Sequence, residues 1–186
     1  MKPVKVGIIG CGNISSIYFK NAQKFGILDL IAAADLIPER VEAQAAEFNI
    51  PHVYYSGAEL LENPEIELVV NLGTPDVHAE ICLAALNAGK HVYVEKPLAI
   101  ALEEGQAILN LAKAKGLLVG GAPDTFMGGG IQTCRKLIED GLIGEPIGGT
   151  AFMVNHGHES WHPDPEFYYK VGGGPMFDMG PYYLTA

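Results

Sequence analysis

The chain has 186 residues, with 12 Lys plus Arg against 22 Asp plus Glu, so its formal charge at pH 7 is −10 with His neutral. Apolar residues make up 48% and charged residues 18%, which is typical of a folded protein and excludes a disordered one. The acidic balance argues against a nucleic-acid or anionic-membrane surface, and no run of about 18 uncharged apolar residues predicts a transmembrane helix.

The first two-thirds of the chain alternates between strand and helix patterns. Val4–Ile9 is a continuous apolar run, and Asn13–Phe25 carries apolar residues at helical spacing. The other strands expected are Leu28–Ala34, His52–Tyr55, Glu67–Leu72, His91–Val94 and Leu117–Gly120. The helices expected between them are Pro38–Phe48, Ala58–Glu62, Thr74–Ala88 and Ala101–Lys115. Six short strands alternating with helices predict an α/β fold, with a doubly wound parallel sheet covered on both faces.

The pattern changes after about Gly121. The elements expected there are a helix, a long strand, a loop and a last helix, over Gly128–Asp140, Glu145–His156, His156–Val171 and from about Gly172 onward. One long strand cannot pair its own backbone groups. We therefore expect a complete domain at residues 1–121 and the start of a truncated α+β domain at residues 122–186.

The first strand ends in a dinucleotide-binding pattern. Gly10, Gly12 and Ser15 form a G-x-G-x-x-S arrangement between a predicted strand and a predicted helix. Gly10 permits a tight turn, Gly12 lets a pyrophosphate approach the backbone, and Ser15 allows close packing of helix on strand. Asp35 ends the second strand, where it is either a solvated turn residue or the acceptor for both ribose hydroxyls. The candidate cofactor-binding residues here are Gly10, Gly12, Asn13, Ile14 and Asp35.

Asp35 also bears on which nucleotide is bound. A carboxylate repels a 2′-phosphate, and the following Leu36 and Ile37 offer no cation to hold one. We therefore expect NAD in preference to NADP. Arg40, one helical turn later, is interpreted as a surface residue.

Two further strand ends carry polar residues. Thr74 and His78 lie around the first turn of a predicted helix, where phosphate and ribose groups are attracted, and Thr74 is also the expected N-cap. Glu95 and Lys96 end the next strand, in the crevice expected to face the cofactor. A lysine there is either a surface residue or a group that acts on a substrate hydroxyl. All four residues are candidates for cofactor contacts.

Together these motifs resemble those of the Gfo/Idh/MocA oxidoreductase family. The resemblance rests on the glycine turn, Asp35, Thr-Pro-Asp-Val-His at 74–78, Glu-Lys-Pro at 95–97 and Gly-Gly-Gly-Pro-Met-Phe-Asp-Met-Gly-Pro-Tyr at 172–182. It implies a Rossmann domain followed by a substrate and oligomerisation domain with an open, largely antiparallel sheet, of which this chain holds the first part. It also implies hydride transfer between NAD(H) and a secondary alcohol of a sugar, inositol or polyol, and a homo-oligomer when complete.

The resemblance also implies catalytic roles. Lys96 matches the family's catalytic lysine, Asp178 matches its substrate-contacting aspartate, and the peptide before Pro97 is expected to be cis. Where the family has a histidine, this chain has Tyr182, and the pKa of an ordinary tyrosine is near ~10. A neighbouring ammonium such as that of Lys96 would have to lower the pKa of Tyr182 before it could accept a proton. The alternative is that Tyr182 packs in the core.

Two functions of other classes stay open on this sequence. One is an NAD-dependent glycosidase that oxidises its substrate transiently, and the other is a nucleotide-binding protein without turnover. The three histidines and the glutamate of residues 156–162 could bind zinc, but nothing there orients such ligands, and we expect no metal. One or two of these histidines could instead contact a polyol.

Cysteine usage indicates the compartment. Cys11, Cys82 and Cys134 are an odd number at wide spacing, and the N-terminal residues have no signal-peptide layout. We therefore expect reduced thiols and a cytoplasmic location.

Overall fold

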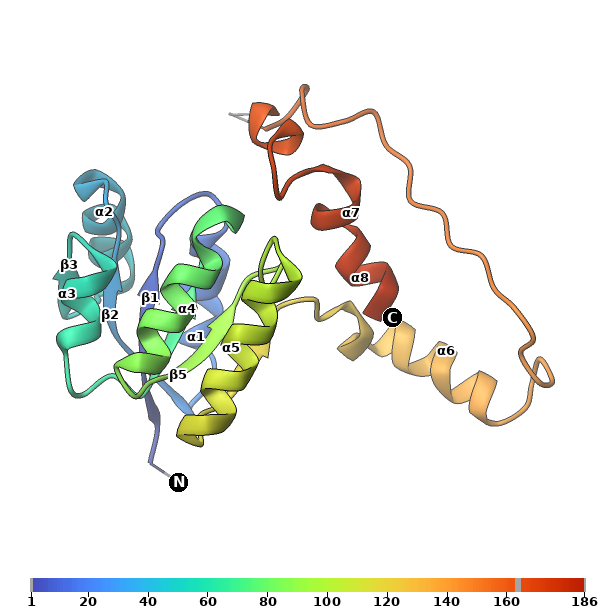
Figure 1. Ribbon diagram of the computed structural model, residues 1–186, viewed down its shortest axis with the longest axis horizontal. Coiled ribbons are helices and arrows are strands. Elements are labelled where there is room, and N and C mark those ends of the chain that lie inside the picture. The colour runs from blue at the N-terminus through green and yellow to red at the C-terminus, as the bar shows by residue number, and fades with distance from the viewer. Residues whose placement is uncertain (1, 163–164, 186) are drawn as a thin grey trace. The chain divides into compact units, whose positions relative to one another are not determined.

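The computed structural model describes residues 2–162 and 165–185 (Figure 1). The chain divides into two compact units, Met1–Gly121 and Ala122–Ala186.

The first unit is built on a six-stranded sheet in which every neighbouring pair of strands is parallel. The strands are β1 (Val4–Ile9), β2 (Leu28–Ala34), β3 (His52–Tyr54), β4 (Leu68–Asn71), β5 (His91–Val94) and β6 (Val119–Gly121), in the order β3-β2-β1-β4-β5-β6. The α-helices are α1 (Ser15–Ala22), α2 (Pro38–Phe48), α3 (Gly57–Glu62), α4 (His78–Asn87) and α5 (Leu102–Lys115), with a 3-10 turn η1 (Pro75–Val77) before α4. The predicted α/β fold with a doubly wound parallel sheet is confirmed.

Successive side chains of a strand point to opposite faces of the sheet, and both faces are apolar here. Ile8 packs with Phe19 of α1 and Val41 of α2 in one buried cluster. Its neighbour Ile9 packs with side chains of α3, α4 and α5, such as Leu60, in a second cluster. Figure 1 shows α4 and α5 on one side of the strands and α1 on the other. Two cores therefore flank one sheet.

Three consecutive alanines end β2, and all of them are fully buried. Ala33 belongs to the cluster under α1 and α2, while Ala32 and Ala34 belong to the cluster under α3 to α5. A methyl group is the smallest side chain that still covers the backbone, so helices on both faces can approach β2 closely.

The strand ends are level at the carboxyl edge of the sheet. In the register of the sheet Ile9 pairs with Ala34 on one side and with Asn71 on the other, and Asn71 pairs in turn with Val94. The residues that follow these four positions therefore leave the sheet at one height. The sheet order reverses between β1 and β4, which is where ligands bind in open α/β sheets.

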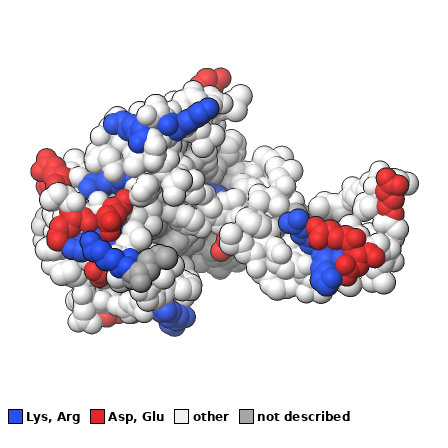
Figure 2. Space-filling model, turned by 90° about the horizontal axis from the view of Figure 1, so that it is seen from below, with Lys and Arg blue, Asp and Glu red and all other residues white. Residues whose placement is uncertain are grey.

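The second unit, as far as it is described, contains helices and irregular backbone. Its elements are η2 (Thr125–Met127), α6 (Gly129–Glu139), η3 (Pro165–Tyr169), α7 (Gly174–Asp178) and α8 (Gly180–Thr185). The helix predicted over Gly128–Asp140 is found as α6. Two ion pairs lie at its C-terminal end, Arg135–Glu139 and Lys136–Asp140, each with an N–O distance of 2.8 Å. On the face seen in Figure 2, some acidic and basic side chains lie side by side and others lie apart.

The prediction of a long strand over Glu145–His156 is wrong. These residues have no strand conformation, and residues 141–152 are all exposed. A strand needs a neighbour to which its backbone can hydrogen bond, and no other segment between residues 122 and 185 that the structure describes is a strand.

The single helix predicted from about Gly172 onward is divided in two. It breaks between α7 and α8 at Met179, just before Gly180 and Pro181. Proline has no N–H to continue the hydrogen bonding of the preceding helix but fits the first turn of a new one. None of the helices in the described part of the chain has both the length and the apolar surface that crossing a bilayer requires.

Candidate functional site

The glycine turn after β1 has the geometry that its sequence pattern predicts. Gly10 has φ +100°, and a Cβ there would lie 2.6 Å from the carbonyl oxygen of Leu72, so only glycine fits. A Cβ on Gly12 would meet nothing within 4 Å, which leaves open space beside the backbone. The buried hydroxyl of Ser15 donates to the carbonyl of Gly12 at 2.7 Å, so the third small residue ties the turn to α1.

The first turn of α1 presents backbone to this open space. Asn13 and Ile14 are exposed, and Ile14, at the N-cap position, makes no side-chain capping hydrogen bond. The N–H groups at a helix N-terminus attract an anion such as a phosphate. The turn and the start of α1 can therefore receive a pyrophosphate.

Asp35 is held against the glycine turn rather than turned into solvent. Its Oδ2 accepts a hydrogen bond from the backbone N–H of Cys11 at 2.7 Å, and its Oδ1 accepts one from Ile37 N–H at 2.8 Å. A carboxylate oxygen has more than one acceptor direction, so both oxygens can still accept from further hydroxyls. The structure thus brings Asp35 together with Gly10 and Gly12.

Cys11 fills the space between the turn and the sheet. Its side chain is buried, and its Sγ lies 3.7 Å from the carbonyl oxygen of Ala34. Burial, and then the neighbouring carboxylate of Asp35, raises the pKa of the Cys11 thiol to about 12. A thiol with so high a pKa is inert and acts as a small packing group.

The loop after β4 is organised by a buried asparagine that sequence reasoning missed. Asn71 is 0% exposed; its Nδ2 donates to the His78 carbonyl at 3.1 Å, and its Oδ1 accepts from Gly73 N–H at 3.1 Å. These bonds tie the end of the strand to the start of α4. The sequence does contain one signal for this role, since Asn71 is a polar residue at the end of an otherwise apolar strand.

His78 is also buried, at 1% exposed. Its Nδ1 lies 2.6 Å from the carbonyl oxygen of Pro97, and its Nε2 lies 2.9 Å from that of Gly73. Thr74, by contrast, is exposed. It occupies the N-cap position of η1, but its side chain makes no capping hydrogen bond. The expectation that Thr74 caps the helix is therefore wrong.

The loop after β5 carries Glu95 and Lys96. Glu95 is buried, its Oε1 accepts from the hydroxyl of Tyr18 at 2.5 Å, and its Oε2 accepts from the backbone N–H of Lys96 at 2.9 Å. The Lys96–Pro97 peptide bond is cis, as the resemblance implied. Sequence reasoning missed Tyr18, because no local signal links a residue on α1 with a strand end 77 positions later.

Asp178 and Tyr182 belong to the second unit, at the end of α7 and within α8. Asp178 Oδ2 lies 3.3 Å from Nε2 of His158, whose side chain is buried. The His158 ring also lies against the ring of Tyr168, with centroids 4.0 Å apart. Burial, then the charges of Asp178 and Glu159, raise the pKa of Tyr168. The loop histidine thus contacts the aspartate of the predicted catalytic motif.

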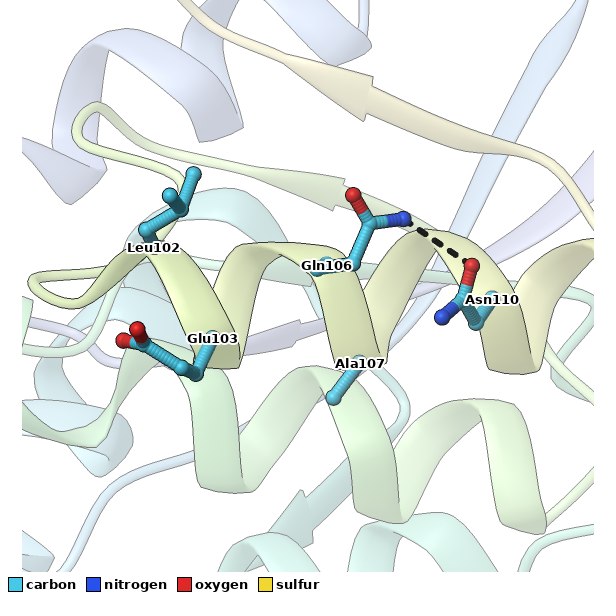
Figure 3. Close-up of a pocket in the computed structure, with 5 residues that line it drawn as sticks. All are labelled: Leu102, Glu103, Gln106, Ala107 and Asn110. Atoms are coloured by element: carbon cyan, nitrogen blue, oxygen red, sulfur yellow. Dashed lines mark hydrogen bonds between the residues drawn. The ribbon is translucent and has the colours of Figure 1, made fainter.

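A hollow on the surface of α5 holds none of the predicted site residues. It is lined by Leu102, Glu103, Gln106, Ala107 and Asn110, all from this one helix (Figure 3). The Gln106 amide donates to Asn110 Oδ1 at 2.9 Å across it. Within the described ranges, no three His, Cys, Asp or Glu side chains are grouped so that they could hold a metal ion.

Two family models match the chain. Residues 4–121 match the Gfo/Idh/MocA model described as "Oxidoreductase family, NAD-binding Rossmann fold". Residues 131–186 match the model described as "GFO/IDH/MocA C-terminal domain".

Individual relatives agree with these matches. The scyllo-inositol 2-dehydrogenase (NADP(+)) of Bacillus subtilis is 30% identical over 97% of this chain and 50% of the relative. The structure of an NAD-binding protein from Listeria innocua superposes with TM-score 0.81 and 25% identity over 98% of this chain and 53% of that one. The scyllo-inositol dehydrogenase of Lactobacillus casei, solved with bound NAD(H) and scyllo-inositol, gives TM-score 0.73 and 25% identity over 77% and 43%. The chain spans about half the length of the curated relatives it matches.

Proposed function

The chain belongs to the Gfo/Idh/MocA family of oxidoreductases, and from this premise we propose that it carries the NAD site and the catalytic lysine of a polyol dehydrogenase. The whole enzyme would transfer a hydride between NAD(H) and a secondary alcohol of a sugar, inositol or related polyol. The observation that carries the proposal is the shared edge of the sheet. The glycine turn, Asp35 and Lys96 all follow strand positions that are level in the register.

The residues present fit a dinucleotide. Gly12 leaves the backbone open where a pyrophosphate would approach, and the N-terminus of α1 supplies N–H donors, including those near Asn13 and Ile14. The oxygens of Asp35 stand beside this turn and would accept from the ribose hydroxyls. A carboxylate at that point favours NAD over NADP, because it would repel a 2′-phosphate. Thr74 and Glu95 are the further candidates for cofactor contacts.

When bound, the nicotinamide supplies the hydride chemistry, and the protein supplies orientation and proton handling. Lys96 would hold the substrate hydroxyl by hydrogen bonding and stabilise the developing alkoxide with its charge. Asp178 would orient the same hydroxyl. Tyr182 would take or return the proton, in the role that a histidine has elsewhere in the family. The inositol dehydrogenases among the relatives favour net oxidation over a glycosidase with transient oxidation.

A substrate screen tests this proposal. The whole enzyme is mixed with NAD and, one at a time, with inositols, sugars and other polyols, and the absorbance of NADH is followed. We expect NADH to accumulate with at least one of them. Cleavage of a glycoside without accumulation of NADH, or tight NAD binding with no turnover on the whole panel, would contradict the proposal. We expect the whole enzyme to be cytoplasmic and to form a homo-oligomer. Gel filtration with light scattering would test the oligomeric state.

A further inference from the structure

The backbone around Lys96 is anchored by two side chains, that of the preceding Glu95 and that of His78 on α4. On one side, the N–H of Lys96 donates to Glu95 Oε2 at 2.9 Å, and the carboxylate of Glu95 is itself held by Tyr18. On the other side, the carbonyl oxygen of Pro97 lies 2.6 Å from Nδ1 of His78. The backbone sets the direction of the Cα–Cβ bond, so these contacts fix the place and direction from which the Lys96 side chain starts.

His78 reaches two loops at once. Its ring nitrogens face the carbonyl oxygen of Gly73 after β4 and that of Pro97 after β5. Carbonyl oxygens only accept, so each contact becomes a hydrogen bond when the facing nitrogen carries a proton. A neutral imidazole donates through one nitrogen and an imidazolium through both. The shorter distance, at 2.6 Å, is the one to the loop of Lys96.

The ring is fixed in this position. Its residue begins α4, and the carbonyl of His78 accepts from Nδ2 of Asn71, a residue that is itself 0% exposed. His78 is 1% exposed, so almost none of its surface is open to a ligand. The sequence pattern favoured a direct contact between His78 and the cofactor. Its burial and its two carbonyl partners favour a supporting role instead.

We propose that His78 is a positioning residue, whose Nδ1–H holds the Pro97 carbonyl and thereby the backbone from which Lys96 projects. The inference rests on the proposed function, in which Lys96 acts on the substrate hydroxyl. It assigns the donor role to Nδ1, which supports the lysine loop. The second nitrogen, Nε2, faces the Gly73 carbonyl oxygen and would donate to it only in the imidazolium form.

Two amide substitutions separate these roles, because the asparagine Nδ2 can take the place of histidine Nδ1 and the glutamine Nε2 that of histidine Nε2. We expect His78→Asn to keep kcat near the wild-type value. We expect His78→Gln and His78→Leu to lower kcat about 100-fold, the loss typical of a reacting group displaced by about 1 Å. NAD affinity should stay unchanged in all three. His52→Gln, at an exposed histidine on β3, is the matched control.

Equal kcat values for His78→Asn and His78→Gln, or wild-type kcat in His78→Leu, would overturn the proposal. A measurement on the wild type covers the case in which the variants do not fold. The ¹⁵N spectrum of the histidine rings should show a proton on Nδ1 of His78 that exchanges slowly with water. A bare Nδ1 would overturn the proposal just as directly.

A second spectroscopic reading separates this inference from the function on which it rests. The NMR signal of ¹³C-methylated Lys96, assigned by its loss in Lys96→Met, should shift in His78→Gln and keep its position in His78→Asn. Turnover that survives Lys96→Met would remove the proposed role of the lysine, and the Lys96 signal would then decide the His78 inference by itself. An unmoved signal in His78→Gln would overturn it.

Discussion

The carboxylate of Asp35 accepts a hydrogen bond from the backbone N–H of Cys11 at 2.7 Å, so the residue that ends β2 also fixes the turn that follows β1. Its second oxygen accepts from Ile37 N–H at 2.8 Å, which fixes its own loop as well. The carboxylate is therefore oriented before any nucleotide arrives, and little side-chain entropy would be lost on binding.

Asp35→Ala tests the assignment of the ribose contact. Loss of a charged hydrogen-bond acceptor costs about 1.5–3 kcal/mol, or roughly 10- to 150-fold in affinity for NAD. Discrimination against NADP should relax at the same time, because the repelling charge is gone. Calorimetric titration of both nucleotides measures this. Asp35→Asn is the comparison variant, since it keeps one acceptor oxygen for a backbone N–H and removes the charge together with the second acceptor. Tighter binding of NADP than of NAD by the wild type would contradict the assignment.

Gly10 and Gly12 should respond differently to the same added methyl group. Gly10→Ala places a Cβ 2.6 Å from a carbonyl oxygen at φ +100°, and should lower the free energy of unfolding by about 1–3 kcal/mol. Gly12→Ala meets open space and should leave stability within about 0.5 kcal/mol, yet weaken NAD binding, because the methyl group occupies the approach of the pyrophosphate. Thermal unfolding and NAD titration give the two readings. Wild-type NAD affinity in Gly12→Ala would contradict the proposal that the pyrophosphate approaches the backbone at Gly12.

Lys96→Met separates nucleotide binding from chemistry. Methionine keeps much of the lysine volume and removes the charge, so NAD affinity should change little, while turnover of the whole enzyme should fall about 10²- to 10⁴-fold. The exposed Lys113 on α5 provides the control substitution, Lys113→Met, which should leave both quantities unchanged. Near-normal turnover of Lys96→Met at saturating substrate would refute the proposed chemistry.

The three cysteines should differ in reactivity. In the native chain at pH 8, iodoacetamide should modify Cys134, which is exposed, and spare Cys11 and Cys82, which are buried. Burial raises the pKa of both buried thiols, that of Cys11 to about 12 from its ordinary 9.0. The folded state holds the Cys11 proton more tightly than the unfolded chain does, so the free energy of unfolding should fall as the pH rises from about 9 toward 12. Mass spectrometry of the labelled peptides measures the reactivity, and equal labelling of Cys11 and Cys134 in the native chain would contradict it.

Limited proteolysis should separate the two units. Residues 141–152 are exposed and belong to no helix or strand, so thermolysin should cut there first. Residues 1–121 contain the whole six-stranded sheet and both core clusters, and should survive as a fragment that binds NAD. Size analysis of the digest and NAD titration of the surviving fragment are the measurements. Uniform degradation of both units at one rate would show that residues 1–121 do not fold independently.

The sequence predicts the first unit well because its signals there are local. Val4–Ile9 and Leu28–Ala34 are strands with the predicted ends, and the turn after β1 has a positive φ at Gly10 and open space beside Gly12. The failure over Glu145–His156 has a physical reason: a segment with a strand-like composition becomes a strand only beside a partner, and that partner is not encoded in the segment itself.

Local sequence patterns cannot predict the contacts that organise the candidate site, because these contacts join residues far apart in the chain. Tyr18 and Glu95 meet only because α1 and the end of β5 are brought together by the sheet order. The role of His78 depends on the carbonyl groups of Gly73 and Pro97, and every residue carries a backbone carbonyl, so no side-chain pattern marks these two. The candidate residues can be recognised in the sequence, but the hydrogen bonds that hold them in place can be seen only in the folded structure.

The three buried alanines at the end of β2 connect the two cores with the ligand end of the sheet. Ala33 faces one core and its two neighbours face the other, so a bulkier residue at any of them must push away a helix on one face or the other. Asp35 is the very next residue, and the strain would pass directly to its carboxylate. A library of random variants sorted for loss of nucleotide affinity should therefore contain substitutions of these three alanines as well as of the loop glycines. The three alanine side chains themselves are fully buried.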